Sequence, residues 1–145
     1  MSAFEDLEIL LVEDNEGDIR LTIEAFKEAK IRNHIRVVRD GEEALAYLKK
    51  EAAYADVQTP DIILLDINLP KVDGKEVLHE LKNNPSLKSI PVIMLTTSSA
   101  ESDVQESYLN HANSYVIKPV DLDKFMEVIR SIEEYWISIV KLPSR

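Results

Sequence analysis

The stretch that most constrains this chain is residues 61–71, in which four consecutive apolar residues, 62–65, are followed directly by Asp66. An uninterrupted apolar run of this length is typical of a strand buried on both faces, as in a parallel sheet. Asp66 then lies at the carboxyl end of a central strand, where open α/β sheets bind their ligands. A lone Asp at such a place is more often an ordinary turn carboxylate, so the rest of the chain must decide its role.

Apolar runs and helical patterns alternate five times along the chain, and no linker-like tract separates them. We expect strands near residues 8–12, 34–38, 61–66, 90–95 and 115–117. A helix follows each strand, the fourth near 101–110 and the fifth near 122–140. This alternation predicts one parallel sheet with right-handed crossovers. The fold class is therefore α/β: a single doubly wound (βα)5 flavodoxin-like domain with strand order 2-1-3-4-5. We expect it to cover residues 7–140, with short termini at 1–6 and 141–145.

The predicted strand order brings Glu13, Asp14 and Asp66 together at one edge of the sheet, because strands one and three are neighbours there. Three carboxylates so close repel one another, and a divalent cation relieves the repulsion. Oxygen ligands from carboxylates, a backbone carbonyl and water suit Mg²⁺, and the carbonyl of Asn68 is the candidate. Each acid taken alone also has an ordinary explanation, since Glu13 and Asp14 are suited to the start of a helix.

Two further polar groups follow the remaining central strands. Thr96 after strand four offers a hydroxyl, and Lys118 after strand five offers a positive charge suited to phosphate. Carboxylate, Mg²⁺, hydroxyl and ammonium around one pocket are the groups that phosphoryl transfer requires, with Asp66 as the nucleophile. Thr96 could instead belong to a capping run, and Lys118 could be a solvated lysine. That all five groups fall at carboxyl ends of strands favours a common site.

At this point the sequence closely resembles the receiver domains of response regulators in two-component signalling, over about residues 7–140. The matching motifs are residues 11–15, 64–70, 95–97 and 115–119. The resemblance implies that Asp66 accepts the phosphoryl group from a sensor histidine kinase. It also implies roles for the other positions: Asp14, Asp66 and the Asn68 carbonyl bind Mg²⁺ directly, Glu13 acts through water, Thr96 and Lys118 bind the phosphoryl group, and Tyr115 moves with Thr96 as a switch. Glu13 stands where the family more commonly has Asp.

Three stretches, residues 15–18, 111–115 and 133–140, resemble the small single-domain regulators that serve phytochrome-type histidine kinases. The chain ends five residues after Val140, so we expect no attached effector and an output through association. The resemblance favours a homodimer through helix four, strand five and helix five. Tyr108, Tyr135 and Ile137 are the candidate interface residues, although scattered exposed apolar residues are normal.

Composition indicates where the protein is located and which classes of partner it does not bind. The formal net charge is −10 with no basic patch, which argues against nucleic acid and anionic membranes as partners. No apolar run reaches the ~20 residues that span a bilayer. The sequence contains no cysteine and does not begin with a signal peptide, so we expect a cytoplasmic protein.

The leading interpretation is a phosphorylated signalling switch that is not an enzyme beyond its own phosphorylation and dephosphorylation. The alternative is a Mg²⁺-dependent phosphohydrolase with an Asp nucleophile. Such enzymes usually carry a second Asp two residues after the nucleophile and a substrate cap, whereas position 68 is Asn and the chain has no residues for a cap. A third interpretation is a binding module that is never phosphorylated. Thr96 and Lys118 argue against it.

Overall fold

The computed structural model describes residues 7–28, 33–96, 114–117, 123 and 127. Its elements in chain order are β1 Leu7–Val12, α1 Glu16–Glu28, β2 Asn33–Val38, α2 Gly41–Leu48, the 3₁₀ turn η1 Ala52–Tyr54, β3 Ile62–Asp66, α3 Gly74–Lys82, β4 Val92–Thr96 and β5 Ser114–Ile117. The predicted helices near 101–110 and 122–140 lie outside the described residues, apart from two isolated positions.

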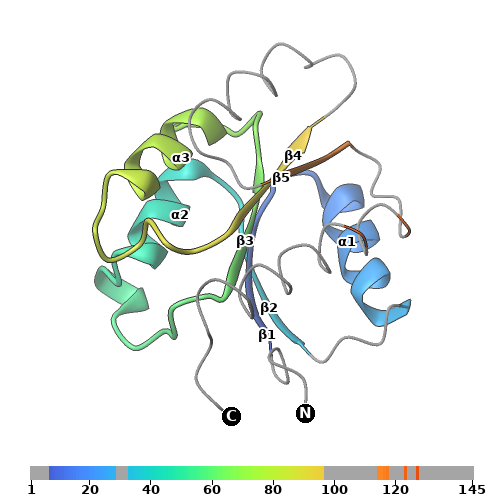
Figure 1. Ribbon diagram of the computed structural model, residues 1–145, viewed down its shortest axis with the longest axis horizontal. Helices are drawn as coiled ribbons and strands as arrows, with labels where there is room; N and C mark the ends of the chain where they lie inside the picture. Colours follow the sequence, from blue (N-terminus) through green and yellow to red (C-terminus); the bar gives the residue numbers. More distant parts are fainter. Residues whose placement is uncertain (1–6, 29–32, 97–113, 118–122, 124–126, 128–145) are drawn as a thin grey trace.

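The five strands form one sheet of order β2-β1-β3-β4-β5, and all four pairings are parallel. This confirms the predicted doubly wound topology. The α1 helix covers one face of the sheet, while α2 and α3 lie together on the other (Figure 1). The sheet therefore has helices on both sides, as expected for a doubly wound fold.

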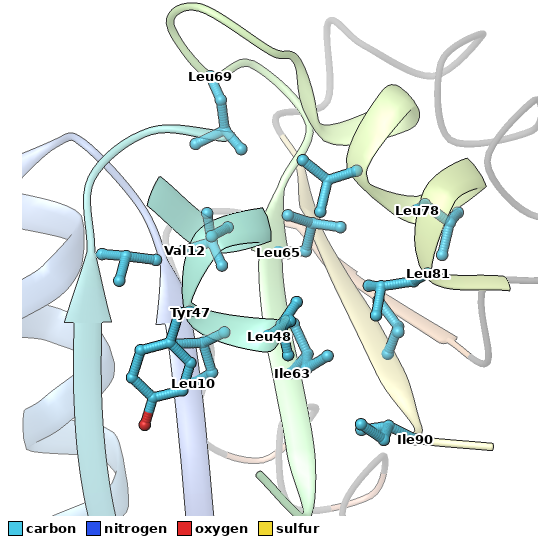
Figure 2. Packing of buried hydrophobic residues seen from close by; sticks show 14 of the residues in the cluster. Leu10, Val12, Tyr47, Leu48, Ile63, Leu65, Leu69, Leu78, Leu81 and Ile90 are labelled. Atoms are coloured by element: carbon cyan, nitrogen blue, oxygen red, sulfur yellow. The ribbon is translucent and has the colours of Figure 1, made fainter. Parts of the chain in front are cut away.

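β3 is buried along its whole length, which confirms the reading of its apolar run. Its residues alternate between two hydrophobic clusters, because successive side chains in a strand point to opposite faces. Ile62 and Leu64 pack with Phe26 on the α1 side, while Ile63 and Leu65 belong to the cluster on the other side. Figure 2 shows this second cluster, in which side chains from β1 and β3 meet those of α2 and α3.

The described helices begin at polar caps that the sequence supplies. Asn15 Oδ1 accepts the amide of Asp18 at 2.9 Å and caps α1. Asp40 caps α2 through the amide of Glu43, and Asp73 caps α3 through the amide of Glu76. Such caps satisfy amides that the first helical turn leaves without an intrahelical partner. α1 and α2 start within four residues of the preceding strand, whereas α3 follows a longer loop after β3.

Candidate functional site

Three carboxylates meet at the carboxyl edge of the sheet. Glu13 follows β1, Asp14 is the next residue, and Asp66 is the last residue of β3. One oxygen atom of each lies within 4.8 Å of the others. The convergence predicted from the strand order is therefore present, because β1 and β3 are paired neighbours.

The three acids differ in exposure, and the backbone explains why. The amide of Glu13 donates to Val38 O at 3.0 Å, so the ladder between β1 and β2 continues one residue past the strand. Glu13 is fully buried and Asp66 is 3% exposed, whereas Asp14 is exposed. The cluster therefore consists of two buried acids and one acid at the surface.

Local hydrogen bonds orient the two buried carboxylates. Glu13 Oε2 accepts the amide of Asn15 at 3.2 Å, and Asp66 Oδ1 accepts the amide of Asn68 at 3.2 Å. In each case the acid accepts an amide two residues further along the chain, a common way for Asp and related side chains to fix a turn. Each bond fixes one carboxylate oxygen of the acid. It also fixes the direction in which the following loop leaves the strand.

The oxygen atoms of this cluster fit a hard divalent cation. Burying carboxylates is costly unless an opposite charge or hydrogen bonds compensate. Mg²⁺ prefers oxygen ligands, often one or two carboxylates with waters. The described residues around the cluster offer no sulfur ligand, since the chain contains no cysteine. The acids at this edge therefore fit Mg²⁺ or a similar ion, and they do not resemble a zinc site.

The other predicted site residues are placed as follows. Thr96 is the last residue of β4, directly beside β3, and it is fully buried. Asn68 is exposed in the loop between β3 and α3. Tyr115 lies in β5, opposite Met94 of β4. Lys118 and the interface candidates Tyr108, Tyr135 and Ile137 lie outside the described residues.

Charged residues at the rim of the site are paired with one another. Arg39, just after β2, donates from Nη1 to Glu16 Oε2 at 2.7 Å and joins the tip of β2 to the first turn of α1. The hydrogen bond to Arg39 lowers the pKa of the Glu16 carboxyl, and the same contact raises the pKa of Arg39. Both side chains are exposed, so their pairing organises the rim more than it stabilises the fold.

Two glycines next to the site have a role that the sequence reading did not identify. Gly41 and Gly74 each follow an Asp that caps a helix. A Cβ on Gly74 would lie 2.2 Å from Asp66 O, and one on Gly41 would lie 1.8 Å from Val72 O. The Asp-Gly pairs in the sequence signalled a turn, but a contact with a distant loop leaves no local pattern.

The fold and the site define a doubly wound α/β protein with an acidic, cation-compatible cluster at the carboxyl edge of its sheet. The chain belongs to the response regulator receiver domain family, whose pattern it matches over residues 9–130. Family membership makes it a signalling protein of the two-component type. The resemblance seen in the sequence is thereby confirmed.

Individual relatives are similar over nearly the whole chain. Response regulator Rcp1 of Synechocystis sp. (strain ATCC 27184 / PCC 6803 / Kazusa) is 46% identical over 136 residues, which cover 94% of this chain and 92% of that protein. The crystal structure of the phosphorylated cyanobacterial phytochrome response regulator RcpA is 48% identical with a TM-score of 0.78, covering 96% of this chain and 99% of that one. The Mn²⁺-bound form of Rcp1 is 45% identical with a TM-score of 0.76, covering 95% and 99%.

In the part of the chain that the structure describes, no helix combines the length and the apolar character needed to cross a membrane.

Proposed function

We propose that this protein is a phosphorylation switch in which Asp66 accepts a phosphoryl group from a sensor histidine kinase in a Mg²⁺-dependent reaction. The observation that carries the proposal is the meeting of three carboxylates within 4.8 Å at the tips of β1 and β3. Thr96 ends the neighbouring strand β4, so a hydroxyl is available at the same edge. The Mn²⁺-bound structure of Rcp1, a relative, supports a divalent ion in such a site.

The protein's own residues then have distinct tasks. Asp66 attacks the phosphorus atom with a carboxylate oxygen, and the phosphorus–nitrogen bond of the donor breaks with its electron pair remaining on the imidazole. Asp14, Asp66 and the Asn68 carbonyl hold the ion directly, and Glu13 holds it through water. When bound, Mg²⁺ supplies positive charge that neutralises the phosphoryl oxygens.

Thr96 and Lys118 bind the transferred group in this proposal. The hydroxyl of Thr96 donates a hydrogen bond to a phosphoryl oxygen, and the ammonium of Lys118 offsets its charge. Movement of Thr96 toward the phosphoryl group leaves space that the Tyr115 ring fills, which changes the surface near β5. The switch thus links chemistry at Asp66 to a surface formed by other elements.

The relatives support a phytochrome-type kinase as the partner, because RcpA is a cyanobacterial phytochrome response regulator. The proposed output is association rather than catalysis: a homodimer through helix four, β5 and helix five, with Tyr108, Tyr135 and Ile137 at the interface. The net charge of −10 supports neither nucleic acid nor an anionic membrane as a partner. A cytoplasmic location stays a prediction.

Incubation with acetyl phosphate and Mg²⁺, followed by intact mass measurement, tests the phosphorylation. We expect an increment of one phosphoryl group that is lost in Asp66→Asn and kept in Asp56→Asn, which removes an exposed carboxylate from the loop after η1. Rapid turnover of many phosphate esters would instead indicate a phosphohydrolase. No increment in the wild type would support a binding module.

Light scattering of the phosphorylated and unphosphorylated protein tests the proposed association. We expect the dimer population to rise on phosphorylation, and less so in Tyr135→Ala. A monomer in both states at tens of micromolar would contradict the dimer proposal and leave the phosphorylation proposal intact.

A further inference from the structure

The loop between β3 and α3 carries Asn68, and it is fastened to a turn that belongs to a different part of the sheet. The amide of Gly41, the first residue of α2, donates to Pro70 O at 3.4 Å. Gly41 and Pro70 are far apart in the sequence, so this contact exists only in the folded protein. The turn between β2 and α2 therefore lies directly against the loop that follows Asp66.

The approach is so close that only glycine fits at position 41. A Cβ there would lie 1.8 Å from the carbonyl oxygen of Val72, 2.7 Å from its carbonyl carbon and 2.8 Å from its Cβ. Real Cβ atoms essentially never come within 3.0 Å of such atoms, so the Val72 carbonyl would have to retreat by about 1.2 Å (from 1.8 to 3.0 Å). Val72 is four residues from Asn68 in the same short loop, so the movement would reach the site.

A side-chain contact supports the same junction. Lys71 has a φ of 66°, a left-handed conformation that is uncommon for a residue with a side chain. Its Nζ lies 3.7 Å from Asp40 Oδ2 and 3.8 Å from Glu42 Oε1. Asp40 uses its other oxygen, Oδ1, to accept the amide of Glu43 at 2.7 Å and cap α2. One carboxylate thus joins the start of α2 to the loop.

The far end of the loop is held in a similar way. The amide of Gly74 donates to Ile67 O at 2.9 Å, which closes the loop on itself. A Cβ on Gly74 would lie 2.2 Å from Asp66 O, so α3 begins against the backbone of Asp66. With Gly74 at one side and Gly41 at the other, the position of the backbone around Asn68 is set by packing on both sides.

We propose that Gly41 is a positioning residue for the metal site, assisted by the contact of Lys71 with Asp40 and Glu42. The β2–α2 turn holds the β3–α3 loop where the Asn68 carbonyl can reach the ion that the carboxylates bind. This inference rests on the proposed function, because it assumes that the Asn68 carbonyl is a ligand. Gly41 touches no ligand itself and acts through Pro70 and Val72.

Binding of Mn²⁺, followed by electron paramagnetic resonance of the free ion, measures the effect without any phosphorylation. We expect Gly41→Ala to raise the Mn²⁺ dissociation constant by about 10- to 100-fold, the range found when residues supporting metal ligands are changed. Lys71→Gln should raise it by about threefold, since exposed ion pairs contribute little. The matched control is Lys49→Gln, because Lys49 Nζ lies 3.7 Å from Glu80 Oε2 between α2 and α3. It should bind as the wild type does.

Urea unfolding of the same variants separates loop displacement from loss of the fold. Wild-type binding that is lost in Asp66→Asn establishes the metal site. If the site is established and Gly41→Ala folds but binds within twofold of the wild type, the positioning role is wrong while the proposed function stands. If Gly41→Ala does not fold, the comparison of Lys71→Gln with Lys49→Gln decides, and equal affinities overturn the inference. If Asp66→Asn binds like the wild type, both proposals fail.

Discussion

Replacing Asp66 by Asn should stabilise the protein when no divalent ion is present. Unit charges 4.8 Å apart, the limit within which the three carboxylate oxygens lie, repel by about 3.5 kcal/mol at an effective dielectric constant of about 20. The exposure of Asp14 reduces this value. We therefore expect Asp66→Asn to raise the free energy of unfolding by about 1–2 kcal/mol. The amide oxygen of Asn can still accept the Asn68 amide, so the local geometry is kept.

Adding Mg²⁺ should reverse the order of stability. An ion that binds only the folded protein stabilises it by about 2.7 kcal/mol at a concentration 100 times the dissociation constant. The wild type gains this amount and Asp66→Asn gains little, because one of the carboxylate ligands is gone. Urea unfolding with EDTA and then with saturating Mg²⁺ measures both values. The wild type should be less stable than Asp66→Asn in EDTA and more stable than it in Mg²⁺.

Asp56→Asn is the matched control, since it removes the same charge from an exposed position outside the acidic cluster. It should unfold like the wild type in EDTA and respond fully to Mg²⁺. The reasoning is refuted if Asp66→Asn is no more stable than Asp56→Asn without the ion. It is also refuted if both variants gain equal stability from Mg²⁺.

Substitutions at three further positions test the packing, a half-buried hydrogen bond and a helix cap. Leu64→Ala, in the fully buried β3, should lower the free energy of unfolding by about 2–5 kcal/mol in urea titrations. Tyr54→Phe removes a 2.7 Å hydrogen bond to Glu43 and should cost about 1 kcal/mol. That bond raises the pKa of Tyr54 above 10.0, so the folded state keeps a proton that the unfolded state loses. The contribution is therefore complete below pH 10 and declines above it, and the difference between wild type and Tyr54→Phe should shrink there. Asp73→Ala should lower stability by about 1 kcal/mol through the lost cap of Glu76, while Asp73→Asn should keep most of it in thermal melts.

The sheet could be predicted from the sequence because its strands leave a strong local pattern. β3 and β4 are apolar up to the polar residue that ends each of them, as is typical of strands covered on both faces. β2 lies at the edge of the sheet, and its exposed residues His34 and Arg36 alternate with less exposed ones. The strand order follows from a general rule of doubly wound sheets, and that order predicts that the acids lie together.

Burial of polar residues was harder to predict, because it depends on tertiary contacts. Glu13 and Asp14 are adjacent and chemically alike, yet the ladder bond from Glu13 to Val38 keeps only the first of them inside. Tyr47 was not expected in the core, but it is 5% exposed, and burial raises the pKa of its hydroxyl. The contact between Gly41 and Val72 joins segments about thirty residues apart, so no periodicity in either segment reveals it.

Charged groups have hydrogen-bond partners at the amino ends of the strands (the amino edge), whereas at the carboxyl ends they face like charges. At the amino edge, Asp61 Oδ2 accepts the amide of Glu8 at 2.9 Å, and the Asp61 amide donates to Glu8 O at 2.7 Å. On the same side of the fold, Lys82 donates to Lys88 O and Ile90 O, and burial lowers the pKa of its ammonium group.

These groups stabilise the connections that lead into β3 and β4. At the carboxyl edge, by contrast, like charges face one another within 4.8 Å. Stability is often given up at functional sites and recovered elsewhere in a protein. The amino edge and the two clusters around β3 hold the scaffold, which allows the carboxyl edge to keep three acids together, as the proposed binding of an ion and a phosphoryl group requires.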